Sequence, residues 1–271
     1  MDGWLGKLEL SFALKNGRSV LTKFSHLGPF FVQKSFYPEI DKTTPHVYLL
    51  HPPGGLVGGD QLLLKVLLEP GSQVLLTTPG ASKFYRTNGM YASQQYIFKL
   101  SENTVLEWVP QSSIFFPESK GKINTTFELK KGARLISFEI LCFNSLNLNK
   151  FSCSPEDIDI FLNIKLPDSV GLRNRLRMNA IDCVDKLSGF QMIASFFAVP
   201  ADIIVLKKVR RLIQSMNSLQ IGGVSLLDDL LVVRVLGNDN QRLQALLHCI
   251  WSNIRPILLK KEVVLPRIWF T

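Results

Sequence analysis

The sequence predicts a mainly β fold, a single β-rich domain with two α-helices in the C-terminal third of its 271 residues. Apolar and polar residues alternate with a period of two through much of residues 8–166, which is typical of half-buried strands. Turn sequences containing Gly, Pro or Asn separate these segments about every ten residues, as in all-β domains. In the last third, apolar residues recur at helical spacing.

Three segments show the strand alternation most clearly: LELSFA at residues 8–13, INTTFEL at 123–129 and IDIFLNIKL at 158–166. The clearest turn signals are KNGR at 15–18, EPGS at 69–72 and KKGA at 130–133. Short strands with such punctuation predict a β-sandwich, a barrel or a stacked β-solenoid. The sequence has no repeat of constant length, which argues against a regular solenoid.

The two helices are expected at about residues 202–216 and 239–254. Asp202 is expected to cap the first helix, and Asn238 or Asn240 the second. Between them, residues 223–237 form a strand-like apolar run that is broken by two aspartates. No linker rich in Gly, Ser or Pro separates the helices from the β region, so we expect one domain over residues 1–271.

The net charge of +9 favours an acidic partner surface, a nucleic acid or simply solubility. The densest basic run, KKVRR at residues 207–211, lies in the first predicted helix, without the strand aromatics of a platform that binds single-stranded nucleic acid. We therefore interpret this run as a solvated helix face.

Cellular location is predicted from segments that the sequence lacks. The most apolar stretch, beginning at Phe190, contains a proline and an aspartate and is too short to span a membrane. The N-terminus does not resemble a secretory leader. Four cysteines lack the spacing of a zinc site or a disulfide scaffold, so we expect reduced thiols in a cytoplasmic protein.

The stretch HPPGGLVGGD, residues 51–60, predicts a tight turn made by Gly54, Gly55, Gly58 and Gly59. Two of these glycines have the spacing of a phosphate-binding loop. Asp60 stands where that loop has its lysine, and a carboxylate there would repel a phosphate. A nucleotide site is therefore not expected.

Polar residues within apolar strands are the remaining candidates for chemistry. Glu139 and Cys142 interrupt the apolar run LISFEILCF, and a buried carboxylate must be paired or face water. Glu139 could form a structural salt bridge with Lys83 or Arg86, or it could be functional. Asp60, Glu139 and Cys142 together provide the mixed oxygen and sulfur donors that a borderline divalent metal accepts transiently.

Several blocks in this order resemble the UreD family of urease accessory proteins, called UreH in some bacteria. The blocks are FYPEIDKTTPHVYLLHPPGGLVGGDQL, LLTTPGASKFYRT, LEWVPQSSIFF, FEILC, VSLLDDLLVVRVLG and PRIWFT. The resemblance covers almost the whole chain. It implies a partly β-helical fold with two helices, and a non-catalytic factor that binds UreF, through it the GTPase UreG, and apo-urease. It further implies transient nickel, with no tightly bound cofactor, and an internal passage that delivers the metal to urease.

Matching the family blocks places eight residues on the expected nickel passage: Asp60, Thr77, Thr78, Lys83, Arg86, Glu107, Glu139 and Cys142. Asp60 and Glu139 are the expected weak nickel contacts, since a conduit must bind the ion and also release it. The chain departs from the family at Ser112, where the family commonly has glutamate. It departs again at Asn144-Ser145, where Gly-Arg is usual.

Three other functions compete with the nickel passage. The protein could be a purely structural adaptor whose buried polar residues are all paired. It could be an enzyme that uses Asp60 and Glu139 as an acid and base pair, although no nucleophile motif is present. It could bind nucleic acid through its basic residues, with affinity that falls steeply as salt increases.

Overall fold

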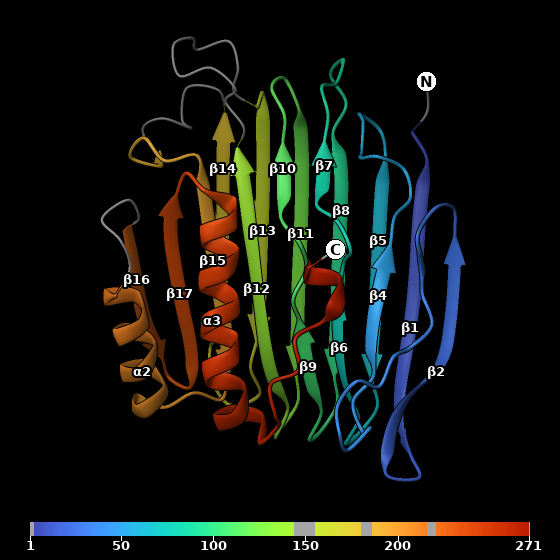
Figure 1. Cartoon of the computed structure of the whole chain (residues 1–271). Coiled ribbons are helices and arrows are strands. Elements are labelled where there is room, and N and C mark those ends of the chain that lie inside the picture. Colours follow the sequence, from blue (N-terminus) through green and yellow to red (C-terminus); the bar gives the residue numbers. More distant parts are fainter. Residues whose placement is uncertain (1–2, 144–154, 180–185, 216–220, 271) are drawn as a thin grey trace.

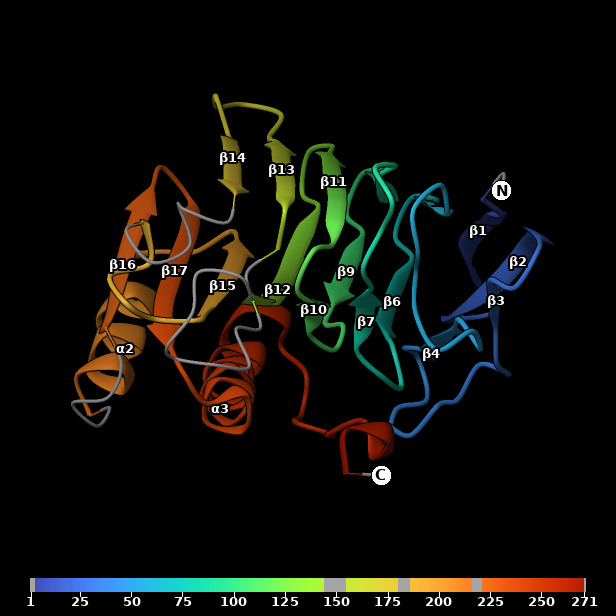
Figure 2. The ribbon, with the colours of Figure 1, turned by 90° about the horizontal axis from the view of Figure 1, so that it is seen from above.

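The computed structural model describes residues 3–143, 155–179, 186–215 and 221–270. Its strands form two sheets that lie face to face, seen edge-on in Figure 2. The seven-stranded sheet has the order β14 (Leu172–Asn179), β13 (Asp157–Lys165), β11 (Lys120–Leu129), β8 (Ala92–Leu100), β5 (Gln61–Leu68), β1 (Leu5–Lys15) and β2 (Arg18–Leu27). The predicted strands at residues 8–13 and 123–129 lie within β1 and β11, and that at 158–166 nearly coincides with β13.

The second sheet has ten strands. Its main path is β16 (Ile221–Leu227), β17 (Leu230–Gly237), β15 (Met192–Val199), β12 (Arg134–Phe143), β9 (Val105–Trp108), β6 (Gln73–Thr77), β4 (His46–Leu50) and β3 (Phe31–Val32). Two short strands, β7 (Ser82–Phe84) and β10 (Ser113–Phe115), join it at β12. The run at residues 223–237 is a hairpin of β16 and β17 that turns at the two aspartates.

The centre of the molecule is β-helical, because the chain alternates between the sheets and most central strands pair in parallel. In the ten-stranded sheet, residue 46 pairs with 75, 73 with 105 and 105 with 134, so successive coils span 29, 32 and 29 residues. In the other sheet, residue 120 pairs with 157, a coil of 37 residues. These unequal lengths explain why the sequence shows no constant repeat.

The main core fills the space between the sheets. Strand β1 sends Leu8, Leu10 and Phe12 inward while the residues between them face outward, as period-two alternation predicts. Phe115 stacks between Phe84 and Phe143, with ring centroids 4.6 and 5.4 Å away. A second core lies between the ten-stranded sheet and the helices.

Helices α2 (Ile203–Gln214) and α3 (Asn240–Leu259) cover the outer face of the ten-stranded sheet (Figure 1). Asp202 caps α2 as predicted, by accepting bonds from two backbone amides of its first turn. The predicted cap of the second helix was wrong: Asp239 caps α3. This helix also extends five residues beyond the predicted residue 254, because packing on the sheet holds its last turn despite Pro256.

After α3, the chain crosses the outer face of the ten-stranded sheet and ends in a 3₁₀ helix, η2 (Arg267–Phe270), near β4 and β6 (Figure 1). Trp269 stacks on His248 of α3 with ring centroids 3.9 Å apart and donates a hydrogen bond to the Thr77 hydroxyl. None of the helices in the described ranges is long and apolar enough to cross a membrane.

Candidate functional site: a polar cavity between the sheets

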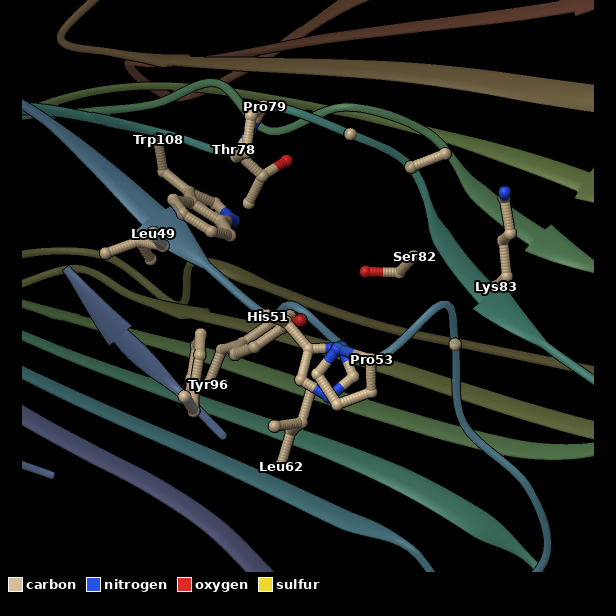
Figure 3. Close-up of a pocket in the computed structure, with 14 residues that line it drawn as sticks. Leu49, His51, Pro53, Leu62, Thr78, Pro79, Ser82, Lys83, Tyr96 and Trp108 are labelled. Atoms are coloured by element: carbon tan, nitrogen blue, oxygen red, sulfur yellow. The ribbon is translucent and has the colours of Figure 1, made fainter. Parts of the chain in front are cut away.

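A cavity of about 330 Å³ lies between the two sheets, beneath the glycine-rich turn (Figure 3). Phe30, Leu49, Leu62 and Trp108 form much of its apolar wall. Its polar lining consists of His51, Thr78, Ser82, Lys83 and Tyr96. Because these residues come from both sheets and from the loops after β4 and β6, only the closed coils bring them together.

A second cavity of about 30 Å³ adjoins the first, since Thr78, Ser82, Tyr96 and Trp108 line both. Its other walls include Thr125 of β11 and Glu139 of β12. The two chambers therefore lead from the glycine-rich turn toward Glu139. They contain the polar side chains that an ion or ordered water requires.

Glu139 faces this interior because its neighbours on β12, Phe138 and Ile140, belong to the core beneath the helices. Burial raises the pKa of the Glu139 carboxyl to about 7, although the positive charge of Arg234 lowers it in part. The predicted structural salt bridge is not formed. Arg86 is exposed and pairs with Glu118 at 2.6 Å, and no cation of the described residues lies within ion-pair distance of Glu139.

His51 provides a nitrogen to the larger cavity. Its Nε2 is buried and has no hydrogen-bond partner in the part of the chain that the structure describes. Burial lowers the pKa of the imidazole, against a smaller opposing effect of Asp60, so the ring is neutral at pH 7. A neutral imidazole with a free nitrogen can accept a proton or bind a metal ion.

Sequence reasoning missed four polar residues of this interior: His51, Ser82, Gln94 and Tyr96. Gln94 donates a hydrogen bond to the Ser82 hydroxyl at 3.1 Å, while its own carbonyl oxygen has no partner among the described residues. Burial raises the pKa of the Tyr96 hydroxyl. The available signal was the alternation itself, which places Gln94 and Tyr96 on the same face as the buried Phe98.

Asp60 lies beside the glycine-rich turn and lines neither cavity. Its two carboxylate oxygens accept hydrogen bonds from the backbone amides of Trp4, at 3.2 Å, and Val57, at 2.8 Å. The turn is tight at this point: Gly59 has a φ of +96°, and a side chain at Gly58 would come within 2.0 Å of the Thr87 hydroxyl. The geometry thus gives Asp60 a structural role, which is to tie this turn to the start of β1.

The turn also brings Gly54 and Gly55 close to β7 and its neighbours. A side chain at Gly55 would meet the Lys83 carbonyl oxygen at 2.6 Å, and the Gly54 carbonyl accepts a hydrogen bond from Tyr85 at 3.2 Å. Gly55 itself lines the larger cavity. The absence of a side chain therefore allows this turn to close over the interior.

Glu107 is directed to the opposite face of its sheet, into a buried ion network. It accepts bonds from Arg255 of α3 at 3.0 Å and from the indole of Trp251 at 2.7 Å. Arg255 also pairs with Glu39, which His46 and Lys261 contact at 3.2 and 3.4 Å. Burial alone would raise the pKa of Glu39, but a hydrogen bond with His46 and the positive charge and hydrogen bond of Arg255 lower it to about 2.

Thr77 and Cys142 also face the helices. Thr77 donates to the Val109 carbonyl at 2.6 Å, and the Cys142 sulfur lies 3.9 Å from the Asn240 side-chain oxygen. Burial raises the pKa of the Cys142 thiol to about 12, against a smaller lowering by Ser112. The thiol is therefore protonated at neutral pH, and a protonated thiol is a poor metal ligand.

Three of the eight predicted passage residues thus line the cavities: Thr78, Lys83 and Glu139. The other five do not line them: Asp60, Thr77, Arg86, Glu107 and Cys142. Within the described ranges, no cluster of three or more His, Cys, Asp or Glu side chains could hold a metal ion.

The pKa of Glu139 predicts a pH-dependent difference in stability between the wild type and Glu139→Gln. The pKa of this carboxyl is near 4.5 in the unfolded chain and about 7 in the folded protein. The protonated carboxyl therefore contributes its full stability to the fold below pH 4.5, and this contribution is lost as pH rises through 7. Urea denaturation at pH 8 should find Glu139→Gln more stable by about 3 kcal/mol, with no such advantage at pH 4.5. An equal difference at both pH values would contradict the raised pKa.

Comparison with known proteins gives consistent matches over nearly the full chain. A family model described as "UreD urease accessory protein" matches residues 5–270. The urease accessory protein UreD of Blochmanniella pennsylvanica is 61% identical over 100% of this chain and 97% of its own length. The proteins of the same name from Pseudomonas putida GB-1 and Klebsiella pneumoniae (ATCC 700721) are 44% and 37% identical, each over 99% of this chain and 95% and 96% of their own lengths.

Proposed function

Because the chain belongs to the UreD family of urease accessory proteins, we propose that it is a non-catalytic assembly factor that delivers nickel during urease maturation. In this proposal it acts in the cytoplasm, binds UreF and through it the GTPase UreG, and docks them on apo-urease. Nickel passes through the polar chambers between the two sheets, as cargo rather than as a bound cofactor.

The observation that carries this proposal is the pair of chambers that contain the buried His51 nitrogen and the Glu139 carboxyl. Imidazole nitrogen and carboxylate oxygen are both ligands of divalent nickel. Few ligands at each position favour release of the ion as well as entry. Since the carboxyl must lose its proton to bind a cation, arrival of the ion at Glu139 would release a proton.

The structural adaptor is the second candidate, and it has its own support. Both carboxylate oxygens of Asp60 and both of Glu107 accept hydrogen bonds, as an adaptor with paired polar residues requires. The acid and base enzyme has less support, because Asp60 lines neither of the chambers that Glu139 approaches. We therefore place the distinction between conduit and adaptor at His51 and Glu139.

The test is reconstitution of urease activity from apo-urease, UreF, UreG, nickel and this protein. Glu139→Leu and His51→Phe should reduce urease activation severalfold while the accessory complex, followed by size-exclusion chromatography, still forms. The matched control is Glu69→Gln, which changes an exposed carboxylate at a turn and should activate urease normally.

Each outcome separates two functions. If both interior variants fold, form the complex and activate urease like the wild type, the protein is an adaptor and nickel takes another route. If activation does not depend on the wild-type chain at all, the maturation role itself is wrong. Circular dichroism and thermal unfolding establish that each variant is folded before activity is compared.

A further inference from the structure

The outward face of the seven-stranded sheet concentrates positive charge. Alternation along β1, β5, β8, β11, β13 and β14 places one set of side chains in the core and the other on this face. Ten cations on this face, of which Lys23 comes from β2, are Lys7, Lys23, Lys65, Lys99, Lys120, Lys122, Lys165, Arg173, Arg175 and Arg177. The anions on this face are Glu9, Glu128, Asp157 and Asp159. These ten cations and four anions sum to +6, and the whole chain carries +9.

No described helix lies over this face, whereas both helices cover the far side of the other sheet (Figure 2). The face is also hollowed. A groove of about 400 Å³ runs across β2, β1, β5 and β8, and Leu67, which is 41% exposed, lies in it beside Ile97. Lys23 pairs with Ser11, Ser11 with Leu67 and Leu67 with Lys99 in the strand register. The two lysines therefore lie on either side of Leu67.

The charges at the groove are only partly neutralised. Glu9 pairs with Lys7 at 2.9 Å and with Lys65 at 3.5 Å. Lys23 and Lys99 have no carboxylate of the described residues within ion-pair distance. Glu128 lies opposite Lys99 in the strand register without forming an ion pair with it, so Lys23 and Lys99 beside an exposed leucine provide both charge and apolar contact for a partner.

We propose that the outward face of the seven-stranded sheet, the basic face that carries the charged residues listed above, docks an acidic protein surface. The inference rests on the proposed function, in which the acidic surface belongs to a maturation partner. A second copy of this chain is disfavoured, since two faces of +6 repel each other. A nucleic acid is disfavoured because four carboxylates lie among the cations and the groove is lined by aliphatic rather than stacking aromatic side chains.

The test is binding of the full chain to apo-urease and to the UreF–UreG pair, each as a separate probe, at 50 to 500 mM salt. The variant Lys23→Glu/Lys99→Glu should weaken binding to at least one probe by about tenfold or more at low salt. The difference should shrink as salt increases, because ions screen exposed charges. The control Lys34→Glu/Lys207→Glu makes the same change in charge at exposed positions away from this face and should bind like the wild type.

If both double variants bind each probe with the same affinity as the wild type, this inference is wrong. If the wild-type chain nevertheless binds the probes and activates urease, the maturation role stays intact. A salt-dependent complex with double-stranded DNA that only the Lys23→Glu/Lys99→Glu variant loses would overturn it in favour of nucleic acid. A wild-type chain that neither binds a probe nor activates urease would overturn both proposals.

Discussion

Arg255→Ala is expected to lower the free energy of unfolding by about 3–5 kcal/mol, because it leaves two carboxylates buried without their main cation. Glu107 and Glu39 are 1% and 5% exposed, and Arg255 itself is fully buried. The guanidinium also donates to the backbone carbonyl of Glu262, so it ties α3 to both the sheet and the C-terminal segment. Urea denaturation at pH 7 measures this loss.

A control on the same helix distinguishes the buried network from charge in general. Arg242 is 54% exposed and pairs with Asp239, so Arg242→Ala should change stability by less than about 1 kcal/mol. The double variant Arg255→Met/Glu107→Leu should lose less than the sum of the two single changes, since each single change leaves a buried charge unpaired. Equal losses for Arg255→Ala and Arg242→Ala would show that the buried network contributes nothing beyond a surface pair.

Asp60→Ala is expected to lower the free energy of unfolding by about 2–4 kcal/mol, because two backbone amides lose their acceptor. The amides of Trp4 and Val57 both bond to this carboxylate, so its removal loosens the start of β1 and the glycine-rich turn together. Asp60→Asn retains one side-chain oxygen and should lose less. Thermal and urea unfolding of both variants measure the effect.

Asp168→Ala provides the comparison, since Asp168 is exposed in a turn and its loss should leave stability unchanged within about 0.5 kcal/mol. Urease activation then separates structure from nickel transfer at Asp60. A folded Asp60→Asn protein that activates urease fully would confine Asp60 to a structural role. A stable variant that forms the complex but fails to activate urease would make Asp60 a nickel contact, as the family resemblance implies.

Glu107 and Glu139 show how far sequence patterns could define the site. Each is a carboxylate within an apolar strand, in LEW and in FEIL, and nothing in the sequence distinguishes their surroundings. In the structure, Glu107 faces the helices and meets Arg255, which is 148 residues away along the chain. Glu139 faces the space between the sheets and has no such partner among the described residues. Their partners come from other coils, and local spacing carries no information about those coils.

The sequence by itself determined the features that depend on neighbouring residues: strand periodicity, the turns, the Asp202 cap and the strand-like character of residues 223–237. These features follow from backbone sterics and from burial of one face of each element, both of which are local. Only the tertiary structure decided which face of each strand meets the other sheet and which meets the helices. That choice depends on parallel pairing between residues 29 to 37 positions apart, and it is this pairing that places His51 and Glu139 in adjoining cavities and Glu107 in a salt bridge.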